Sequence, residues 1–163
     1  MNTARIGRCG ELLVQYELLK LGIESAPMTT DAGVDLVAYA PSPGEAVTIQ
    51  IKTNRQAKHS GSGKSKAALG WSVRNPVPAA LVALVDLSSE EVWLFTKGEF
   101  EEHAQQKRTR QLHLYMYTDA GVKPRRYGLM RVGEFDRFRL RNRASELFGL
   151  EGIGAGHDPR GRR

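Results

Sequence analysis

The sequence has little cysteine and no long apolar run. Its 163 residues include one cysteine, Cys9, which excludes an internal disulfide and a zinc site built from several cysteines. No stretch approaches the roughly 20 apolar residues of a membrane-spanning helix. The first residues, MNTARIGRCGE, show no apolar stretch before their first acid. We therefore expect no signal peptide and no membrane partner, and we predict a cytoplasmic protein.

Acidic residues are scarce in the second part of the chain. Residues 1–106 hold 10 Lys or Arg and 12 Asp or Glu, a balance of −2, whereas residues 107–163 hold 14 and 6, a balance of +8. Such an imbalance indicates a polyanionic partner, with nucleic acid as the first candidate. A solvated basic surface is the alternative interpretation.

The first element predicted by periodicity is a helix over residues 3–21. Thr3 is a suitable N-cap, and Gly22 is a suitable residue to end the helix. Arg8, Glu11 and Gln15 fall on one face of this helix. We expect an apolar stripe on another face to be buried, formed by Cys9, Leu12, Leu13, Tyr16 and Leu19.

The rest of the chain alternates between strand and helix patterns. Residues 34–40 and 46–53 read as a hairpin, and 80–87 is a near-continuous apolar run typical of a central strand covered on both faces. Further elements are predicted as strands at 92–96 and 112–117 and helices at 97–107 and 134–148. The order predicts a single α/β domain over residues 1–150 with a mixed central sheet flanked by helices. The Gly- and Arg-rich residues 151–163 are predicted to be disordered.

Two polar residues interrupt the apolar strand TIQIKT at residues 48–53. Gln50 and Lys52 are two apart, so both side chains point to the same face of a strand. If Asp35, in the preceding strand, points to that face too, a carboxylate, an amide oxygen and an ammonium converge. The two oxygens are hard ligands suited to Mg²⁺, and the Ile51 carbonyl between them is another. Glu11, on a helix packed beside the sheet, can complete the site.

This order of residues resembles the PD-(D/E)XK nuclease superfamily, which includes restriction endonucleases, Holliday junction resolvases and some homing endonucleases. The resemblance rests on Glu11, on GVD at 33–35 and on IQIK at 49–52, and it covers roughly residues 3–107. It implies an αβββαβ core and a Mg²⁺-dependent DNA endonuclease, with Mn²⁺ as a substitute. Catalytic roles would fall to Glu11, Asp35, Gln50 and Lys52, and metal ligation to Glu11, Asp35, Gln50 and the Ile51 carbonyl.

Gln50 departs from the family pattern, which usually has an acid at this position. An amide oxygen can ligate Mg²⁺ but brings no charge, and some active members share this QxK form. The alternative hypothesis is a catalytically inactive nucleic-acid-binding relative with the same fold. A homodimer is expected for a nuclease that cuts both strands.

Basic residues near the proposed site are candidates for contacts with DNA phosphates. The segment HSGSGKSKA at 59–67 does not follow a strand directly into a helix, so we reject a phosphate-binding loop and a nucleotide cofactor. The arginines at 137, 139, 141 and 143 are open to two interpretations, phosphate contact and solvated surface. The residues predicted to bind nucleic acid are Arg8, Gln15, Arg55, Lys58, Lys64, Lys66, Arg125 and Arg126.

Overall fold

The computed structural model describes residues 2–29, 32–39, 45–59, 65–124 and 126–150. The predicted disordered tail at 151–163 lies outside these residues. No helix of the described part is long and apolar enough to cross a membrane. The elements in chain order are α1 (Thr3–Lys20), β1 (Glu24–Pro27), β2 (Leu36–Tyr39), β3 (Val47–Asn54), β4 (Lys58–His59), β5 (Ala67–Arg74), β6 (Leu81–Asp86), β7 (Glu91–Thr96), α2 (Lys97–His103), β8 (Gln106–Arg108), β9 (Gln111–Tyr117), the 3₁₀ helix η1 (Val132–Phe138) and α3 (Leu140–Phe148).

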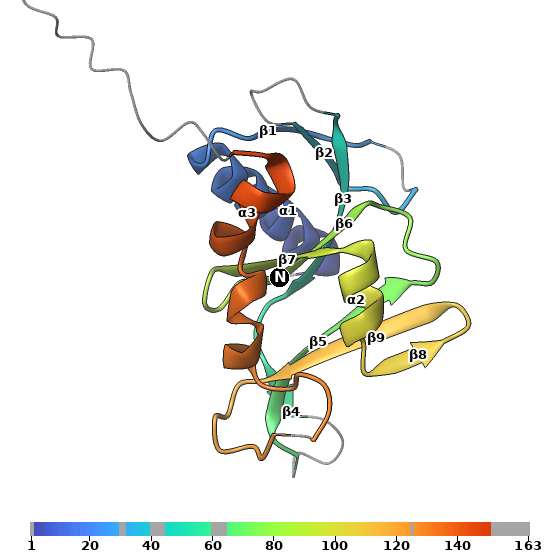
Figure 1. Ribbon diagram of the computed structural model, residues 1–163, viewed down its shortest axis with the longest axis vertical. Helices are drawn as coiled ribbons and strands as arrows, with labels where there is room; N and C mark the ends of the chain where they lie inside the picture. Colours follow the sequence, from blue (N-terminus) through green and yellow to red (C-terminus); the bar gives the residue numbers. More distant parts are fainter. Residues whose placement is uncertain (1, 30–31, 40–44, 60–64, 125, 151–163) are drawn as a thin grey trace, which may run out of the picture.

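A mixed sheet of five strands forms the centre of the molecule, in the order β1-β2-β3-β6-β7. β3 and β6 run parallel, with Ile51 opposite Ala83, and the other neighbouring strands are antiparallel. The helices α1 and α3 lie over one face of this sheet, and α2 lies beside the other (Figure 1). The predicted α/β class with a mixed, helix-flanked central sheet is confirmed.

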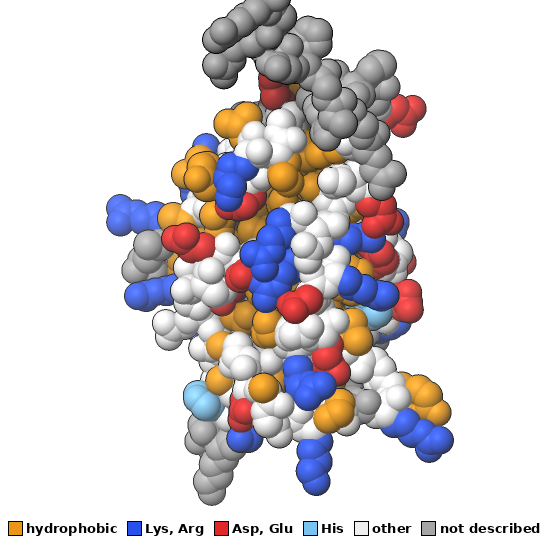
Figure 2. All heavy atoms as spheres, turned by 60° about the vertical axis from the view of Figure 1, so that its left-hand side comes forward, with side chains coloured by type: hydrophobic (Ala, Val, Ile, Leu, Met, Phe, Trp, Pro, Cys, Tyr) orange, Lys and Arg blue, Asp and Glu red, His pale blue; other side chains and the backbone are white. Residues whose placement is uncertain are grey.

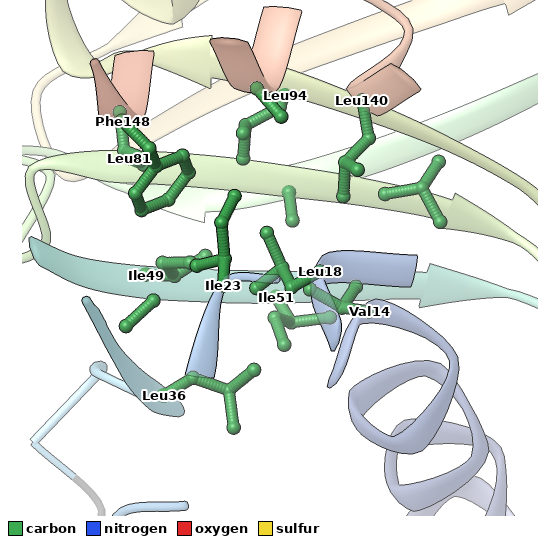
Figure 3. Close-up of a cluster of buried hydrophobic side chains, with 14 of the residues drawn as sticks. Val14, Leu18, Ile23, Leu36, Ile49, Ile51, Leu81, Leu94, Leu140 and Phe148 are labelled. Atoms are coloured by element: carbon green, nitrogen blue, oxygen red, sulfur yellow. The ribbon is translucent and has the colours of Figure 1, made fainter. Parts of the chain in front are cut away.

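The first apolar core lies between the five-stranded sheet and the helices α1 and α3. Figure 3 shows Leu18 of α1 and Phe148 of α3 meeting side chains such as Ile49 and Ile51 of β3. Leu18 and Ile49 are fully buried. The odd-numbered residues of β3 therefore face α1.

The second core lies on the opposite face, where a second sheet packs. This sheet is antiparallel throughout and has the order β4-β5-β9-β8. Trp71 of β5 meets Trp93 of β7 edge to face, with ring centroids 5.9 Å apart, and its indole N–H donates to the Val85 carbonyl at 3.3 Å. β6 is buried along its whole length between the two cores, as predicted for residues 80–87.

The face of α1 that packs on the sheet differs from the predicted stripe. Gly10, Val14 and Leu18 are buried, whereas Tyr16 and Leu19 are 60% and 63% exposed. Gly10 explains the difference, because a β-carbon there would lie 1.9 Å from Thr53 Oγ1. The helix thus approaches β3 through a residue that hydrophobicity does not identify. Its N-cap is also not Thr3: the Asn2 side chain accepts from Arg5 N at 2.9 Å.

Further elements differ from the sequence-based prediction, among them the short strands β1 and β4, which were not predicted. Residues 67–74 form a strand that was not predicted. The helix predicted at 97–107 ends at His103 and is followed by β8. The helix predicted at 134–148 is divided into η1 and α3 at Arg139, whose extended backbone forms a bridge with Trp93.

Candidate metal and phosphate site

The two faces of β3 differ in chemistry. Ile49 and Ile51 point into the α1 core, so Gln50 and Lys52 point to the face away from α1, where Val82 and Leu84 of β6 also lie. Gln50 is only 4% exposed, and Lys52 is half-buried. The predicted alignment of the amide and the ammonium on one face of a strand is therefore present.

Asp35 lies where β2 and β3 part. Their antiparallel register runs as far as Leu36 opposite Ile49, and the Asp35 N–H donates to the Ile49 carbonyl at 2.9 Å. One carboxylate oxygen, Oδ2, accepts from the Ile51 N–H at 2.6 Å. A strand N–H points along the plane of its sheet, so this carboxylate lies at the level of the sheet, between Gln50 and Lys52. We call Asp35 together with residues 50–52 the β2–β3 fork.

The Gln50 side chain is buried with an unsatisfied oxygen. Its Oε1 is one of five buried side-chain atoms of the described chain without a hydrogen-bond partner, and it is the one among them that can only accept. Burial of such an acceptor costs about 1–3 kcal/mol unless something compensates it. A bound cation would supply that compensation.

Gly33 shapes the approach to the fork. Its φ is +80°, and a β-carbon there would lie 2.7 Å from Pro78 Cγ and 3.5 Å from Gln50 Nε2. The backbone therefore passes close over Pro78 before it reaches Asp35, in a conformation that other residues adopt at a cost. GVD at 33–35 is thus a local unit that places the carboxylate.

Glu11 is not in contact with the fork in this structure. It accepts from Arg8 at 2.8 Å, and no hydrogen bond or ion pair among the described residues joins it to Asp35, Gln50 or Lys52. Its helix covers the opposite face of β3 from Gln50. Gly10 packs on Thr53 of β3, and Gln15 donates to the Ser25 carbonyl of β1 at 3.3 Å. Glu11 lies four residues before Gln15 and so on the same face of α1, the face that meets β1.

The donor set of the fork fits a hard divalent cation. In the described ranges no three His, Cys, Asp or Glu side chains gather closely enough to hold a metal ion, so a metal here needs amide and backbone oxygens. The N–H and C=O of one strand residue point to the same edge. Because the Ile51 N–H bonds to Asp35, the Ile51 carbonyl points to that edge as well. Asp35, Gln50 Oε1 and this carbonyl are the oxygen ligands that Mg²⁺ prefers.

The residues predicted to bind nucleic acid lie in two groups. Arg8 and Gln15 are on α1, where the Gln15 bond to β1 is a structural contact that needs no nucleic acid. Arg55, Lys58 and Arg126 are exposed near the second sheet. Lys64 and Arg125 lie outside the described residues. The roles of these residues stay predictions.

Lys66, in the second group, already has an anionic partner. It donates to Asp119 at 2.7 Å, which joins the start of β5 to the loop after β9. The pKa of the Asp119 carboxyl lies below its ordinary value. The largest cause is the hydrogen bond from Lys66, and the second is the hydrogen bond from the Gly121 N–H. Contact between Lys66 and a phosphate would therefore compete with this ion pair.

The arginines of the last helical region are largely engaged within the molecule. Arg139 pairs with Glu91 and Asp136, and Arg143 pairs with Glu99 and Glu146. On this side of the molecule, blue and red side chains alternate in Figure 2, with no continuous basic area. Intramolecular ion pairing thus accounts for two of the four arginines without phosphate contact.

The second sheet carries a groove that was not predicted from the sequence. It has a volume of about 460 Å³ and lies on the outer face of the second sheet, lined by residues such as Gln106, His113 and Tyr115. The alternation in LHLYMY at 112–117, which predicted the strand, also places His113, Tyr115 and Tyr117 on one face. That signal was available in the sequence.

The fold is one that a known nuclease shares. That nuclease is the bacterial homing endonuclease I-Ssp6803I, with a TM-score of 0.59 and 14% sequence identity over 95% of this chain and 100% of the other. At this identity the likeness establishes the fold alone. No family model matches the chain, and no curated protein matches it in sequence.

Proposed function

We propose that this protein is a Mg²⁺-dependent DNA endonuclease of the PD-(D/E)XK type. One observation carries the proposal. The Asp35 carboxylate accepts a hydrogen bond from the Ile51 N–H, and the neighbours of Ile51 in β3 are Gln50, with its buried, unsatisfied oxygen, and Lys52, with its ammonium. The fold shared with a homing endonuclease supports the same class of activity.

Three oxygens of the fork would hold the cation: the Asp35 carboxylate, Gln50 Oε1 and the Ile51 carbonyl. A bound Mg²⁺ lowers the pKa of a coordinated water and neutralises charge on a phosphate. The chain supplies a rigid frame for these ligands, since Ile49 and Gln50 are buried in β3. Mn²⁺, which accepts the same oxygens, would substitute.

Lys52 would act on the reacting groups themselves. Within the described residues its ammonium makes no ion pair or hydrogen bond, and its side chain leaves β3 on the same face as Gln50. It would orient the attacking water and stabilise the negative charge that develops on the phosphate. A preorganised donor of this kind contributes roughly 100- to 1,000-fold in rate.

Glu11 would join the site after leaving Arg8. Their ion pair is exposed, with 27% of the Glu11 side chain and 51% of the Arg8 side chain accessible. Exposed pairs of this kind contribute at most about 1 kcal/mol, so the change of partner costs little. Arg8 would then be available for a DNA phosphate.

The substrate we propose is duplex or branched DNA, bound by a homodimer. Arg55, Lys58 and Arg126 provide exposed positive charge on the side of the second sheet. Two copies of the site are required if both strands are cut. Sedimentation of the free protein and of its DNA complex would test the dimer.

The experiment is cleavage of supercoiled plasmid and of a four-way junction with Mg²⁺, using wild type, Lys52→Ala and Asp35→Ala. Each variant should be at least about 100-fold slower than wild type. The matched control is Lys20→Ala, which removes a lysine from an exposed ion pair on α1 and should cut normally. Cleavage at equal rates by all four proteins would contradict the proposal.

A nucleic-acid-binding relative without activity is the second candidate. The uncharged Gln50 favours it, because the fork then has one carboxylate where the family pattern has two. Salt-dependent DNA binding with no cleavage under any divalent cation would establish this candidate instead.

A further inference from the structure

The second sheet has one apolar and one polar face. On β9, Leu112, Leu114 and Met116 are buried in the second core. The residues between them, His113 and Tyr115, point outward and are half-buried. A sheet of this kind needs only its inner face for stability, so the outer face is free to take another role.

The groove on this outer face has the chemistry of a hydrogen-bonding surface. It offers amides, imidazoles, phenols and an ammonium from β3, β4, β8 and β9 and from the segment after β3. The lining side chains that carry the argument are Asn54, Gln56, Gln106, His113, Tyr115 and Tyr117. The groove is open and mostly polar, so it is unsuited to enclosing a small apolar ligand and suited to the polar edge of a long one.

His113 is held in place on the floor of the groove. Its ring lies over Gly70, where a β-carbon would come within 3.3 Å of Nε2, and it is tilted against the Tyr115 ring with centroids 6.3 Å apart. Burial, followed by the positive charge of Arg108, lowers the pKa of the imidazole. A neutral imidazole offers one donor and one acceptor.

The groove reaches β3 at Asn54, close in sequence to the β2–β3 fork. Asn54 follows Lys52 by two residues on the same face of β3, and its side chain donates to the Gly70 carbonyl at 2.7 Å. Two strand residues span about 6.6 Å, so the end of the groove at Asn54 lies near Lys52.

We propose that the outer face of the β8–β9 ribbon in the second sheet enters the major groove of duplex DNA and recognises base edges near the cleaved phosphate, with Gln106 and His113, which lie opposite each other, as specificity-determining residues. The major groove admits a two-stranded β-ribbon, and amide and imidazole groups match the donors and acceptors displayed there. Arg108, exposed on β8, would contact a phosphate at the rim. The location relative to the cleaved phosphate rests on the proposed nuclease function, whereas base recognition by the groove does not.

The test measures binding and requires no cleavage. Protein carrying Lys52→Ala is used to select from a library of randomised duplexes, and the bound fraction is sequenced. The same selection is repeated with His113→Ala, His113→Gln and Gln106→Ala added. We expect each alanine variant to lose about 10-fold of preference at one or two positions, and His113→Gln to change the preferred base there.

A phosphate contact is tested separately. Arg108→Ala should weaken binding to all sequences alike and reduce the slope of log affinity against log salt by about 0.9. The matched control is Arg141→Ala on α3, which lies beside Glu17, Glu90 and Glu91 and should change neither quantity. Cooperative thermal unfolding of each variant verifies that it is folded.

The outcomes separate this proposal from the proposed function. If the groove variants leave the selected sequence unchanged, or if the parent selects no sequence, recognition by this face is wrong even where Lys52-dependent cleavage is found. If the groove variants change the selected sequence while wild type cuts nothing, the recognition surface stands and the nuclease function fails. Equal selection from single-stranded RNA and duplex DNA would also overturn the proposal.

Discussion

Gln50 and Asp86 are the two buried polar side chains of the described core, and they differ in the hydrogen bonds that they accept. They lie on adjacent parallel strands and point to the same face of the sheet, since Gln50 is opposite Val82 and Asn54 is opposite Asp86. Asp86 accepts three hydrogen bonds, from the backbone and hydroxyl of Ser88 and from the hydroxyl of Ser89. Gln50 Oε1 accepts none from the described residues.

The difference separates a structural role from a binding role. A buried acid with three local donors closes the turn between β6 and β7, and nothing more is required of it. A buried amide oxygen without a donor, beside a carboxylate and an ammonium, costs folding free energy in the free protein. Such a cost is expected where a ligand later supplies the missing contact.

The largest effect should come from replacing each of the two residues by leucine. Asp86→Leu removes the three hydrogen bonds that close the turn and should lower the free energy of unfolding by about 2–3 kcal/mol. Gln50→Leu removes an unsatisfied acceptor and should leave stability unchanged or raise it by up to about 1 kcal/mol. Urea unfolding without divalent cations measures both. Equal destabilisation by the two substitutions would mean that Gln50 is as well satisfied as Asp86.

The next effect concerns the backbone that places Asp35. Gly33→Ala forces a β-carbon into a left-handed conformation and against Pro78, which should cost about 2 kcal/mol. Since Gly33 lies two residues before Asp35, cleavage should fall by more than the loss of folded protein explains. Gly98→Ala, where a β-carbon meets no atom within 4 Å, is the matched control. An active Gly33→Ala enzyme of normal stability would show that this turn does not position the carboxylate.

A smaller effect tests how Asp86 is satisfied. Ser89→Ala removes one of its three hydrogen bonds and should cost about 1 kcal/mol. The loss should disappear in an Asp86→Leu background, because the acceptor is then absent. Double-mutant cycles by urea unfolding give the coupling, and additive losses would argue against this hydrogen bond.

The smallest effect concerns His113, a half-buried polar group outside both cores. Burial and then Arg108 lower its pKa from the ordinary 6.5. The unfolded chain therefore binds this proton more readily, so the contribution of His113 to stability is complete above pH 6.5 and is lost as the pH falls. NMR titration should give a midpoint below 6.5, raised partway toward it by Arg108→Ala. A midpoint above the ordinary value would contradict the environment described.

Much of the sheet can be predicted from local sequence, and its contacts across the chain cannot. The apolar runs of β3 and β6 identify both strands, but their parallel pairing depends on a crossover through β4 and β5, which no local pattern specifies. β5 was missed because a Gly- and Ser-rich segment precedes it, although Leu69, Trp71 and Val73 alternate in the sequence as the residues of a half-buried strand do. Arg139 ends η1 through a bridge to Trp93, far away in sequence.

In the candidate site, too, one part follows from local sequence and another depends on how distant segments pack. The hairpin pattern places Asp35 opposite residues 50–52, because strand alternation and a short turn determine the register. The position of Glu11 depends on which face of α1 packs on β3. That face is chosen by Gly10, which fits closely against Thr53, whereas hydrophobicity favoured Leu12, Tyr16 and Leu19. Helical periodicity therefore predicted the helix correctly but predicted the wrong face of it to be buried.

The central claim is that a cation is the missing partner of Gln50. The most direct test is a titration with Mn²⁺ in which the electron paramagnetic resonance signal of the free ion is monitored. Wild type should bind the ion, Asp35→Ala and Gln50→Leu should lose at least about 10-fold in affinity, and Gln50→Glu should gain affinity through its added charge. Ser89→Ala, which alters the environment of Asp86, should bind as wild type does. Equal Mn²⁺ affinity in all five proteins would contradict the account.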